Sequence, residues 1–200
     1  KAYKLFKEYS LEIIENKSGK TFSEDQMLEQ CSEVDGVVVG LDPMTEKVLR
    51  NAKNLKAISK YGAGLDNIDL KVAEELGIKV DRAAGTNATS VAELAVGLFF
   101  SLARSIPAVS VSTKNGGWDR VRGVELTGKT AGIVGMGNIG KEVARMASGL
   151  GMNIIAYDPY LAPDDKSIAD YSVKMAGLDE VIAGSDFLTL HLPLTDETRY

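Results

Sequence analysis

The sequence has 200 residues, a formal net charge of −5 and 44% apolar residues. This composition is typical of a soluble globular protein and excludes intrinsic disorder as the main state. Acidic residues outnumber basic ones by 28 to 23, so we expect no broad cationic surface and no nucleic-acid partner. One cysteine and one histidine leave no disulfide pair and no cluster for a metal site, and we expect a cytoplasmic location without a signal peptide.

The first part of the chain alternates short apolar runs with segments that have helix-start signals. The first predicted element is a helix that begins at the capping box Ser23–Gln26 and carries Cys31 on its apolar side, as a core residue. In chain order, it is followed by a strand at 37–39, a helix capped by Thr45, a strand at 55–58, a helix capped by Asp69 and a strand at 78–80. This alternation predicts a doubly wound α/β unit with a parallel sheet.

A long apolar helix is predicted from about Ser90 to Ser105. Helical spacing predicts that its core face is formed by Val91, Leu94, Ala95, Leu98 and Leu102. Phe99 and Phe100 widen the apolar surface, so the helix is either an ordinary core helix or one shared with a second subunit. The apolar stretch is far shorter than the roughly 20 residues that span a bilayer, so we expect no membrane segment.

A polar stretch after Pro107 separates this helix from a second α/β series. The series comprises predicted strands at 130–134, 152–157 and 187–191 and predicted helices at 141–150 and 176–184. A linker of small residues at 81–85 favours a boundary between two domains, 1–83 and 84–200.

The strongest chemical signal is a glycine-rich turn between a predicted strand and a predicted helix. Gly135, Gly137 and Gly140 have the G-x-G-x-x-G spacing: the first permits a tight turn, the second lets the backbone approach a pyrophosphate, and the third lets the helix pack on its strand. Asp158 ends the next strand, 21 positions after Gly137, where an acid binds ribose hydroxyls. Because no arginine follows Asp158 to bind the 2′-phosphate of NADP, the sequence favours NAD.

A second glycine turn follows a strand in the first unit. Gly62 and Gly64 flank Ala63 at the carboxyl end of that strand, where exposed backbone amides suit a carboxylate. As an alternative, these glycines form a turn and nothing more.

Five segments together resemble the D-isomer-specific 2-hydroxyacid dehydrogenases, and within them the phosphoglycerate dehydrogenase type. The segments are 60–69, 86–94, 128–135, 137–140 and 186–195. The resemblance implies an incomplete chain with a flavodoxin-like substrate domain and a Rossmann NAD-binding domain, both cut short. It also implies an oxidoreductase that transfers hydride between nicotinamide and C2 of a D-2-hydroxy acid, in a homodimer formed through the helix near Ser90. The substrate that the resemblance favours is 3-phosphoglycerate, in serine biosynthesis.

The same resemblance assigns roles to individual residues. It implies that the substrate carboxylate binds at Tyr61, Gly62, Ala63 and Gly64, and that Lys60 either meets a substrate phosphate or is a solvated surface lysine. It implies that the cofactor is bound by Gly135, Gly137, Asn138, Ile139, Gly140, Asp158, Leu192 and Pro193.

The family's catalytic Arg, Glu and His follow the segment that begins at His191, so we expect no catalytic residue in this chain. We interpret His191 as non-catalytic, Arg122 as a solvated loop residue, and Tyr61 and Trp118 as packing residues. Two other functions remain open: an NAD-sensing binding protein, similar to the C-terminal-binding corepressors, and an NAD-binding domain without activity.

Overall fold

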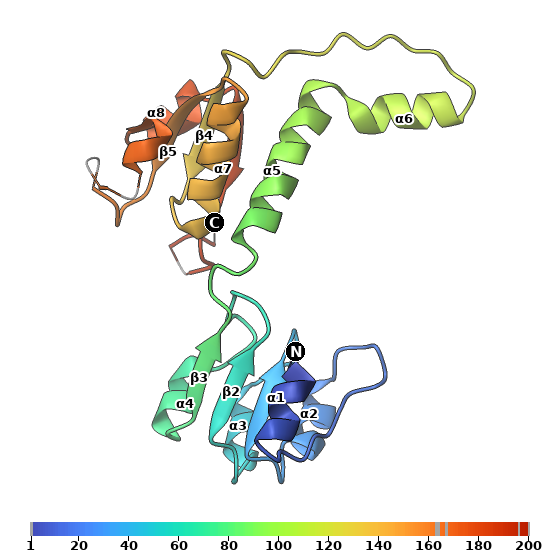
Figure 1. The fold of residues 1–200 in the computed structure, drawn as a ribbon, viewed down its shortest axis with the longest axis vertical. Helices are drawn as coiled ribbons and strands as arrows, with labels where there is room; N and C mark the ends of the chain where they lie inside the picture. The colour runs from blue at the N-terminus through green and yellow to red at the C-terminus, as the bar shows by residue number, and fades with distance from the viewer. Residues whose placement is uncertain (1, 163–164, 167, 196, 200) are drawn as a thin grey trace. The chain divides into compact units, whose positions relative to one another are not determined.

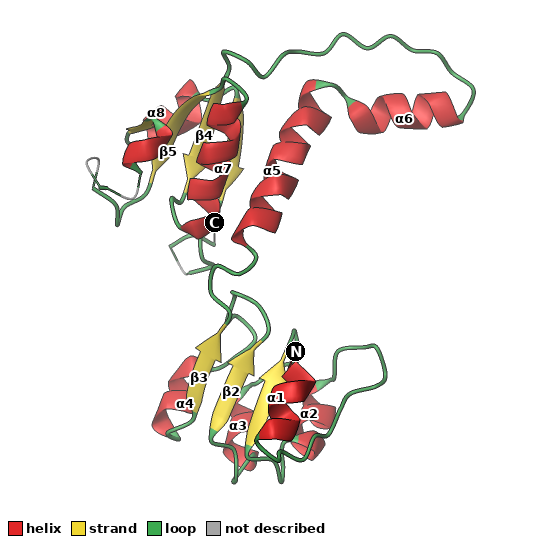
Figure 2. Ribbon diagram, in the orientation of Figure 1, coloured by secondary structure: helices red, strands yellow, loops and turns green. Residues whose placement is uncertain are grey.

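The computed structural model describes residues 2–162, 165–166, 168–195 and 197–199. The chain forms two compact units, Lys1–Arg82 and Ala83–Tyr200. Both consist of a parallel β-sheet with flanking helices (Figures 1 and 2), which confirms the predicted α/β class.

Unit 1 contains a three-stranded parallel sheet in the order β1-β2-β3. Its elements are α1 (Ala2–Glu8), α2 (Glu24–Gln30), β1 (Gly36–Val39), α3 (Glu46–Asn51), β2 (Ala57–Lys60), α4 (Leu70–Glu75) and β3 (Lys79–Arg82). The last residues of the strands are in register, with Lys60 opposite both Val39 and Arg82. The loops that leave the three strands therefore begin at one edge of the sheet.

The three predicted helix caps of unit 1 are confirmed. Ser23 and Gln26 form a reciprocal capping box, and the side chains of Thr45 and Asp69 accept hydrogen bonds from the first turns of α3 and α4. Cys31 is buried in the core as expected, and burial raises the pKa of its thiol. Strand β2 begins two residues later than predicted, because Leu55 is buried from the turn before the strand and so imitates a strand residue.

Unit 2 contains a four-stranded parallel sheet in the order β6-β5-β4-β7. Its elements are α5 (Ala88–Ala103), α6 (Ile106–Lys114), β4 (Thr130–Val134), α7 (Asn138–Gly149), β5 (Asn153–Tyr157), the 3₁₀ turn η1 (Ala169–Tyr171), β6 (Val173–Met175), α8 (Leu178–Gly184) and β7 (Phe187–Leu190). The chain runs outward from β4 to β6 and then returns to the other side of β4. The strand order therefore reverses between β4 and β7, and such a switch point is where open α/β sheets bind ligands.

Helices cover both faces of this sheet. Side chains alternate along β5, so Ile154 and Ala156 join the core beneath α7, whereas Ile155 packs with Val181 of α8. Helix α5 lies against α7 as an outer layer (Figure 1). The site at the switch point is thus held by a sheet that is packed on both faces.

The predicted core face of α5 is correct at Ala95 but wrong at its three leucines. Leu94, Leu98 and Leu102 are 65%, 53% and 71% exposed, and the helix buries a face that is rotated away from them. That face consists mainly of small residues with one aromatic ring: Ala88, Ala92, Ala95, Val96, Phe99 and Ala103. The alanines let α5 approach α7 closely, which a row of leucines would prevent.

Four elements are not predicted from the sequence: α1, α6, η1 and β6. The segment after Pro107 was expected to be a polar stretch, but Pro107 lies in the first turn of α6. A proline is tolerated there because N–H groups in the first turn of a helix have no acceptor within the helix, so proline removes no hydrogen bond. No single helix among the described residues is long and apolar enough to cross a membrane; α5 and α6 meet that length and composition only when taken together across a bend of 65°.

Candidate functional site at the carboxyl ends of the strands

The glycine-rich turn of unit 2 connects β4 to α7 at the switch point. Gly135 has a φ of +96°, and a Cβ there would lie 2.5 Å from the carbonyl oxygen of His191. A Cβ on Gly140 would lie 2.1 Å from the carbonyl oxygen of Gly135, so α7 begins in direct contact with the turn. Gly137 differs from both, because nothing lies within 4 Å of the position that its Cβ would occupy. The turn is therefore packed on two sides and open at Gly137.

The open side of the turn is the amino end of α7. Gly137 is the N-cap residue and offers no side-chain cap to the first turn of the 12-residue helix. Uncapped amides and the positive end of the helix dipole favour a phosphate group. The space at Gly137 and the amides beyond it fit the pyrophosphate of a dinucleotide.

Asp158 directly follows β5, and its carboxylate is bound to the turn. Oδ2 accepts a hydrogen bond from the Met136 N–H at 2.8 Å, and Oδ1 accepts one from the Tyr160 N–H at 2.9 Å. Each carboxylate oxygen can accept more than one hydrogen bond, so the half-buried side chain keeps acceptor capacity for ribose hydroxyls. These two bonds orient the acid before any ligand binds.

The chain leaving β7 lies beside the same turn. The His191 N–H donates to the Val134 carbonyl at 2.8 Å, and the ring atom Nε2 lies 3.0 Å from Thr189 Oγ1. Burial lowers the pKa of His191. Leu192 Cδ2 lies 3.1 Å from the position of a Cβ on Gly135, while Pro193 is exposed.

The two remaining residues of the predicted cofactor set lie at the start of α7. The side chain of Asn138 lies against Gly85, whose Cβ would come within 2.6 Å of Asn138 Nδ2. Ile139 is half-buried against the core. The structure thus brings the turn, Asp158 and the Leu192–Pro193 segment together, with Ile139 serving the packing of the helix.

The glycine turn of unit 1 follows β2. Gly62 has a φ of +136°, and the Tyr61 N–H donates to the Val39 carbonyl at 2.8 Å. Arg82, the last residue of β3, donates from Nη1 to the Ala63 carbonyl at 2.8 Å. Arg82 is not among the predicted site residues, because the predicted third strand ends at residue 80, two residues too early. A strand extended to residue 82 is the signal that would have placed it at this edge.

The interpretation of Lys60 as a solvated surface lysine is wrong. The side chain is 6% exposed, so Lys60 is not a solvated surface residue. Its Nζ donates to the Gly40 carbonyl and, at 2.6 Å, to Asn67 Oδ1. Asn67 Nδ2 donates in turn to the Asp42 carbonyl at 2.6 Å, which fixes the orientation of the amide. Two of the three N–H donors of the ammonium are therefore bonded to the protein, at the loop after β1 and at Asn67.

The expectation that Tyr61 and Trp118 are packing residues is also wrong, since each is 83% exposed. Both follow glycine-rich or strand-end segments, where the backbone leaves the core. Arg122 is exposed, as expected for a loop arginine. Among the residues that the structure describes, no three His, Cys, Asp or Glu side chains form a group suited to a metal ion.

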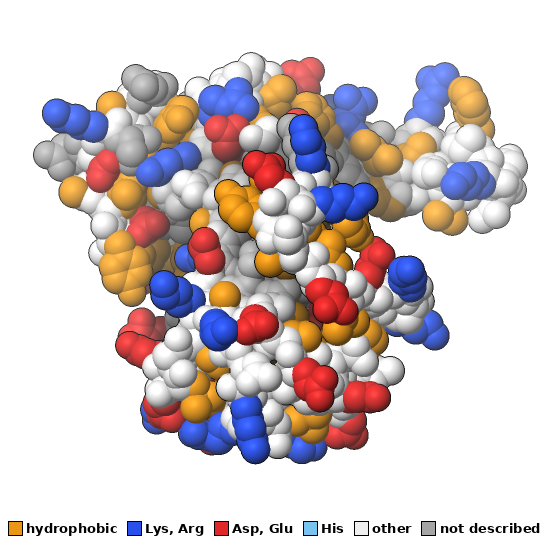
Figure 3. Space-filling model, turned by 60° about the horizontal axis from the view of Figure 1, so that its bottom comes forward, with side chains coloured by type: hydrophobic (Ala, Val, Ile, Leu, Met, Phe, Trp, Pro, Cys, Tyr) orange, Lys and Arg blue, Asp and Glu red, His pale blue; other side chains and the backbone are white. Residues whose placement is uncertain are grey.

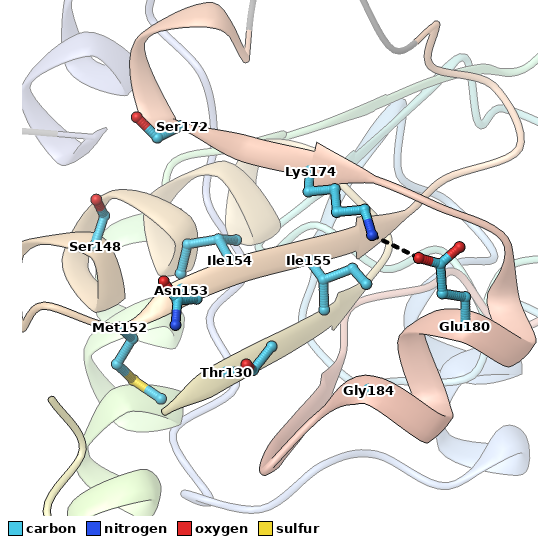
Figure 4. A pocket seen from close by; sticks show the side chains of 10 residues that line it. All are labelled: Thr130, Ser148, Met152, Asn153, Ile154, Ile155, Ser172, Lys174, Glu180 and Gly184. Atoms are coloured by element: carbon cyan, nitrogen blue, oxygen red, sulfur yellow. Dashed lines mark hydrogen bonds and ion pairs between the residues drawn. The ribbon is translucent and has the colours of Figure 1, made fainter. Parts of the chain in front are cut away.

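A cavity of about 550 Å³ lies elsewhere in unit 2 (Figure 4). Thr130 and Asn153, the first residues of β4 and β5, line it, so it lies at the amino edge of the sheet. Lys174 and Glu180 form an ion pair of 2.6 Å at its wall. The cavity is therefore separate from the glycine turn, which follows the carboxyl end of β4.

The family of the chain follows from a match over its second half. Residues 96–200 match the model of the D-isomer specific 2-hydroxyacid dehydrogenase, NAD binding domain. The chain belongs to this family. The cofactor of the matched domain is NAD, in agreement with the open turn at Gly137 and the oriented carboxylate of Asp158.

Two curated relatives and one solved structure illustrate the similarity. The chain is 46% identical over 88% of its length to a hydroxypyruvate reductase of Thermotoga maritima, and 42% identical over 89% of its length to a D-3-phosphoglycerate dehydrogenase of Methanocaldococcus jannaschii. It covers 57% and 34% of those two proteins. An NAD-dependent formate dehydrogenase of Staphylococcus aureus in complex with NAD superposes with a TM-score of 0.84 and 31% identity, over 98% of this chain and 59% of that one.

Proposed function

We propose that the protein is an NAD-dependent oxidoreductase that transfers a hydride between the nicotinamide and C2 of a D-2-hydroxy acid. The observation that carries the proposal is the turn at the switch point of unit 2, where Gly137 is open and Asp158 is already oriented. The family match supports the reaction class, and the names of the two relatives support either 3-phosphoglycerate or hydroxypyruvate as substrate.

The proposal assigns cofactor binding to unit 2. Backbone amides at Gly137, Asn138 and Ile139 hold the pyrophosphate, and the carboxylate of Asp158 accepts hydrogen bonds from a ribose. Gly135 and Gly140 act through the backbone approach that they permit, and Leu192 and Pro193 contact the cofactor beside the turn. When bound, the cofactor supplies the hydride acceptor or donor; the chain's own residues bind and orient it.

The proposal assigns the substrate carboxylate to unit 1. The turn formed by Tyr61, Gly62, Ala63 and Gly64 lies at the carboxyl edge of the sheet, a place suited to an anion. The amides of Gly62, Ala63 and Gly64 would bind the carboxylate, whereas the Tyr61 N–H is bonded to the Val39 carbonyl and anchors the start of the turn. Lys60, which directly precedes this turn, links it to the loop after β1 through its bond to Gly40 and also donates to Asn67. No proton donor is assigned to this chain, because the half-buried ring of His191 has Thr189 as its partner.

Steady-state kinetics of the full-length protein test the proposal. We expect NAD-dependent oxidation of D-3-phosphoglycerate or D-glycerate, detected as formation of NADH, and no oxidation of the L-isomers. An Asp158→Ala variant should raise the KM for NAD about tenfold, because a charge-assisted hydrogen bond is lost. Binding of NAD without turnover of any D-2-hydroxy acid would refute the enzyme and favour an NAD-sensing binding protein.

We also propose that the protein is a homodimer formed through α5. Leu94, Leu98 and Leu102 form a continuous exposed apolar stripe, and α6 buries none of its residues within the chain. Hydrophobic side chains are visible on the segment at the right of Figure 3, where α6 lies. Surfaces of this kind on a monomer mark an interface.

A reducing, cytoplasmic location agrees with the free thiol of Cys31.

Light scattering of a Leu98→Glu variant tests the dimer. A buried glutamate at a dimer interface is strongly unfavourable, so we expect the mass to fall from that of a dimer to that of a monomer. Ile182→Glu is the matched control, because Ile182 on α8 is 51% exposed against 53% for Leu98. A monomeric wild-type protein, or a Leu98→Glu variant that stays dimeric, would contradict this proposal.

A further inference from the structure

Two cationic side chains end neighbouring strands of unit 1, and they have different environments. Lys60 ends β2 and Arg82 ends β3, and their Cα atoms are partners in the register of the sheet. The Lys60 ammonium is buried, and two of its three N–H donors are bonded to Gly40 and Asn67. Arg82 is exposed at the same edge.

The guanidinium of Arg82 is held in place but not neutralised. Nη1 donates to the Ala63 carbonyl at 2.8 Å, which fixes the group beside the glycine turn. Among the described residues, no carboxylate lies within ion-pair distance of Arg82, whereas Arg50 pairs with Glu46 and Glu75. Because a guanidinium has five N–H donors in a planar fork, most of its donors are available to a ligand.

Two carboxylates belong to the same edge of the sheet. Asp81 Oδ1 accepts a hydrogen bond from the Arg82 backbone N–H at 2.7 Å, and the Asp66 carboxylate lies against Gly64. Both would repel an anion bound near the turn. Arg82 is the exposed positive charge that offsets them there, so its presence decides whether this edge accepts a second negative group.

We propose that Arg82 is a specificity-determining residue that binds a second anionic group of the substrate, beyond the carboxylate held at the glycine turn. A guanidinium fork matches the oxygens of phosphate and carboxylate groups, with phosphate gaining most from its greater charge. The inference rests on the proposed function and deepens it: the substrate class becomes D-2-hydroxy acids that carry a phosphate or a second carboxylate.

The test compares substrates that differ in the second group. We would measure kcat/KM of the full-length enzyme for D-3-phosphoglycerate, D-malate and D-glycerate, with wild type, Arg82→Gln, Arg82→Lys and Arg50→Gln. For Arg82→Gln we expect a loss of roughly 10- to 100-fold with D-3-phosphoglycerate, the value of a charge-assisted hydrogen bond, and less than about twofold with D-glycerate. Arg82→Lys should recover part of the loss, and Arg50→Gln should behave as wild type.

The outcomes separate this inference from the function on which it rests. Loss with D-malate as well as D-3-phosphoglycerate supports a site for any second anion, and loss with the phosphorylated acid alone supports a phosphate site. Equal loss with D-glycerate, or no loss with any substrate, overturns the role of Arg82 while the proposed function stands. A wild-type enzyme with the same kcat/KM for D-glycerate as for D-3-phosphoglycerate also overturns the role of Arg82. A wild-type protein without turnover of any of the three overturns both proposals.

Discussion

The packing of α7 on the glycine turn leads to a sharp prediction about Gly140→Ala. A Cβ at this position would lie 2.1 Å from the Gly135 carbonyl oxygen, whereas ordinary contacts begin near 3.4 Å. The collision involves backbone and so cannot be relieved by a side-chain rotation. Helix α7 must therefore retreat from the turn by roughly 1 Å, a gap that forfeits a quarter to a half of each van der Waals contact it makes.

The cost of this retreat follows from what α7 buries. Val143, Ala144 and Ala147 are fully buried on the same helix, so they lose contacts with the sheet together. Overpacking of a core typically costs about 1–3 kcal/mol, and we expect the upper end, offset by roughly 1 kcal/mol of helix propensity gained from alanine. The net loss in the free energy of unfolding is about 2 kcal/mol.

Gly149→Ala provides the matched control, since it makes the same chemical change at the other end of α7. Nothing lies within 4 Å of a Cβ on Gly149, so this variant should gain up to about 1 kcal/mol from helix propensity. Urea unfolding followed by circular dichroism measures both variants, and calorimetry measures their affinity for NAD. A Gly140→Ala protein with wild-type stability and wild-type NAD affinity would show that the close approach of helix and turn is not needed.

Two further predictions concern stability. Ser23→Ala removes one half of the capping box of α2 and should lower the free energy of unfolding by about 1 kcal/mol, measured by urea unfolding; an unchanged midpoint would show that the cap is not needed. His191 has a lowered pKa in the folded protein, so below its ordinary value of 6.5 the unfolded state takes up a proton before the folded state does. The free energy of unfolding of the wild type should therefore fall as the pH drops below 6.5. That of His191→Gln should depend less on pH, when urea unfolding of both proteins is measured above and below 6.5. Parallel curves would contradict this assignment.

The sequence by itself determined the local features of the fold. Helix caps at Ser23, Thr45 and Asp69 were predicted because capping depends on a few neighbouring residues. The glycine turn was predicted for a similar reason: the spacing of Gly135 and Gly140 reflects backbone contacts within one strand-turn-helix unit. The acid after β5 is also found by counting along the chain.

The tertiary structure decided which surfaces pack and what each strand-end side chain contacts. Helix α5 is apolar nearly all round, so periodicity could not distinguish its alanine face from its leucine face; the close approach of α7 did. The environment of Lys60 depends on Gly40 after β1 and on Asn67 after β2, and that of Arg82 depends on Ala63, 19 positions earlier in the chain. One cation is buried and the other is exposed because long-range hydrogen bonds, and not the local sequence, position the two side chains.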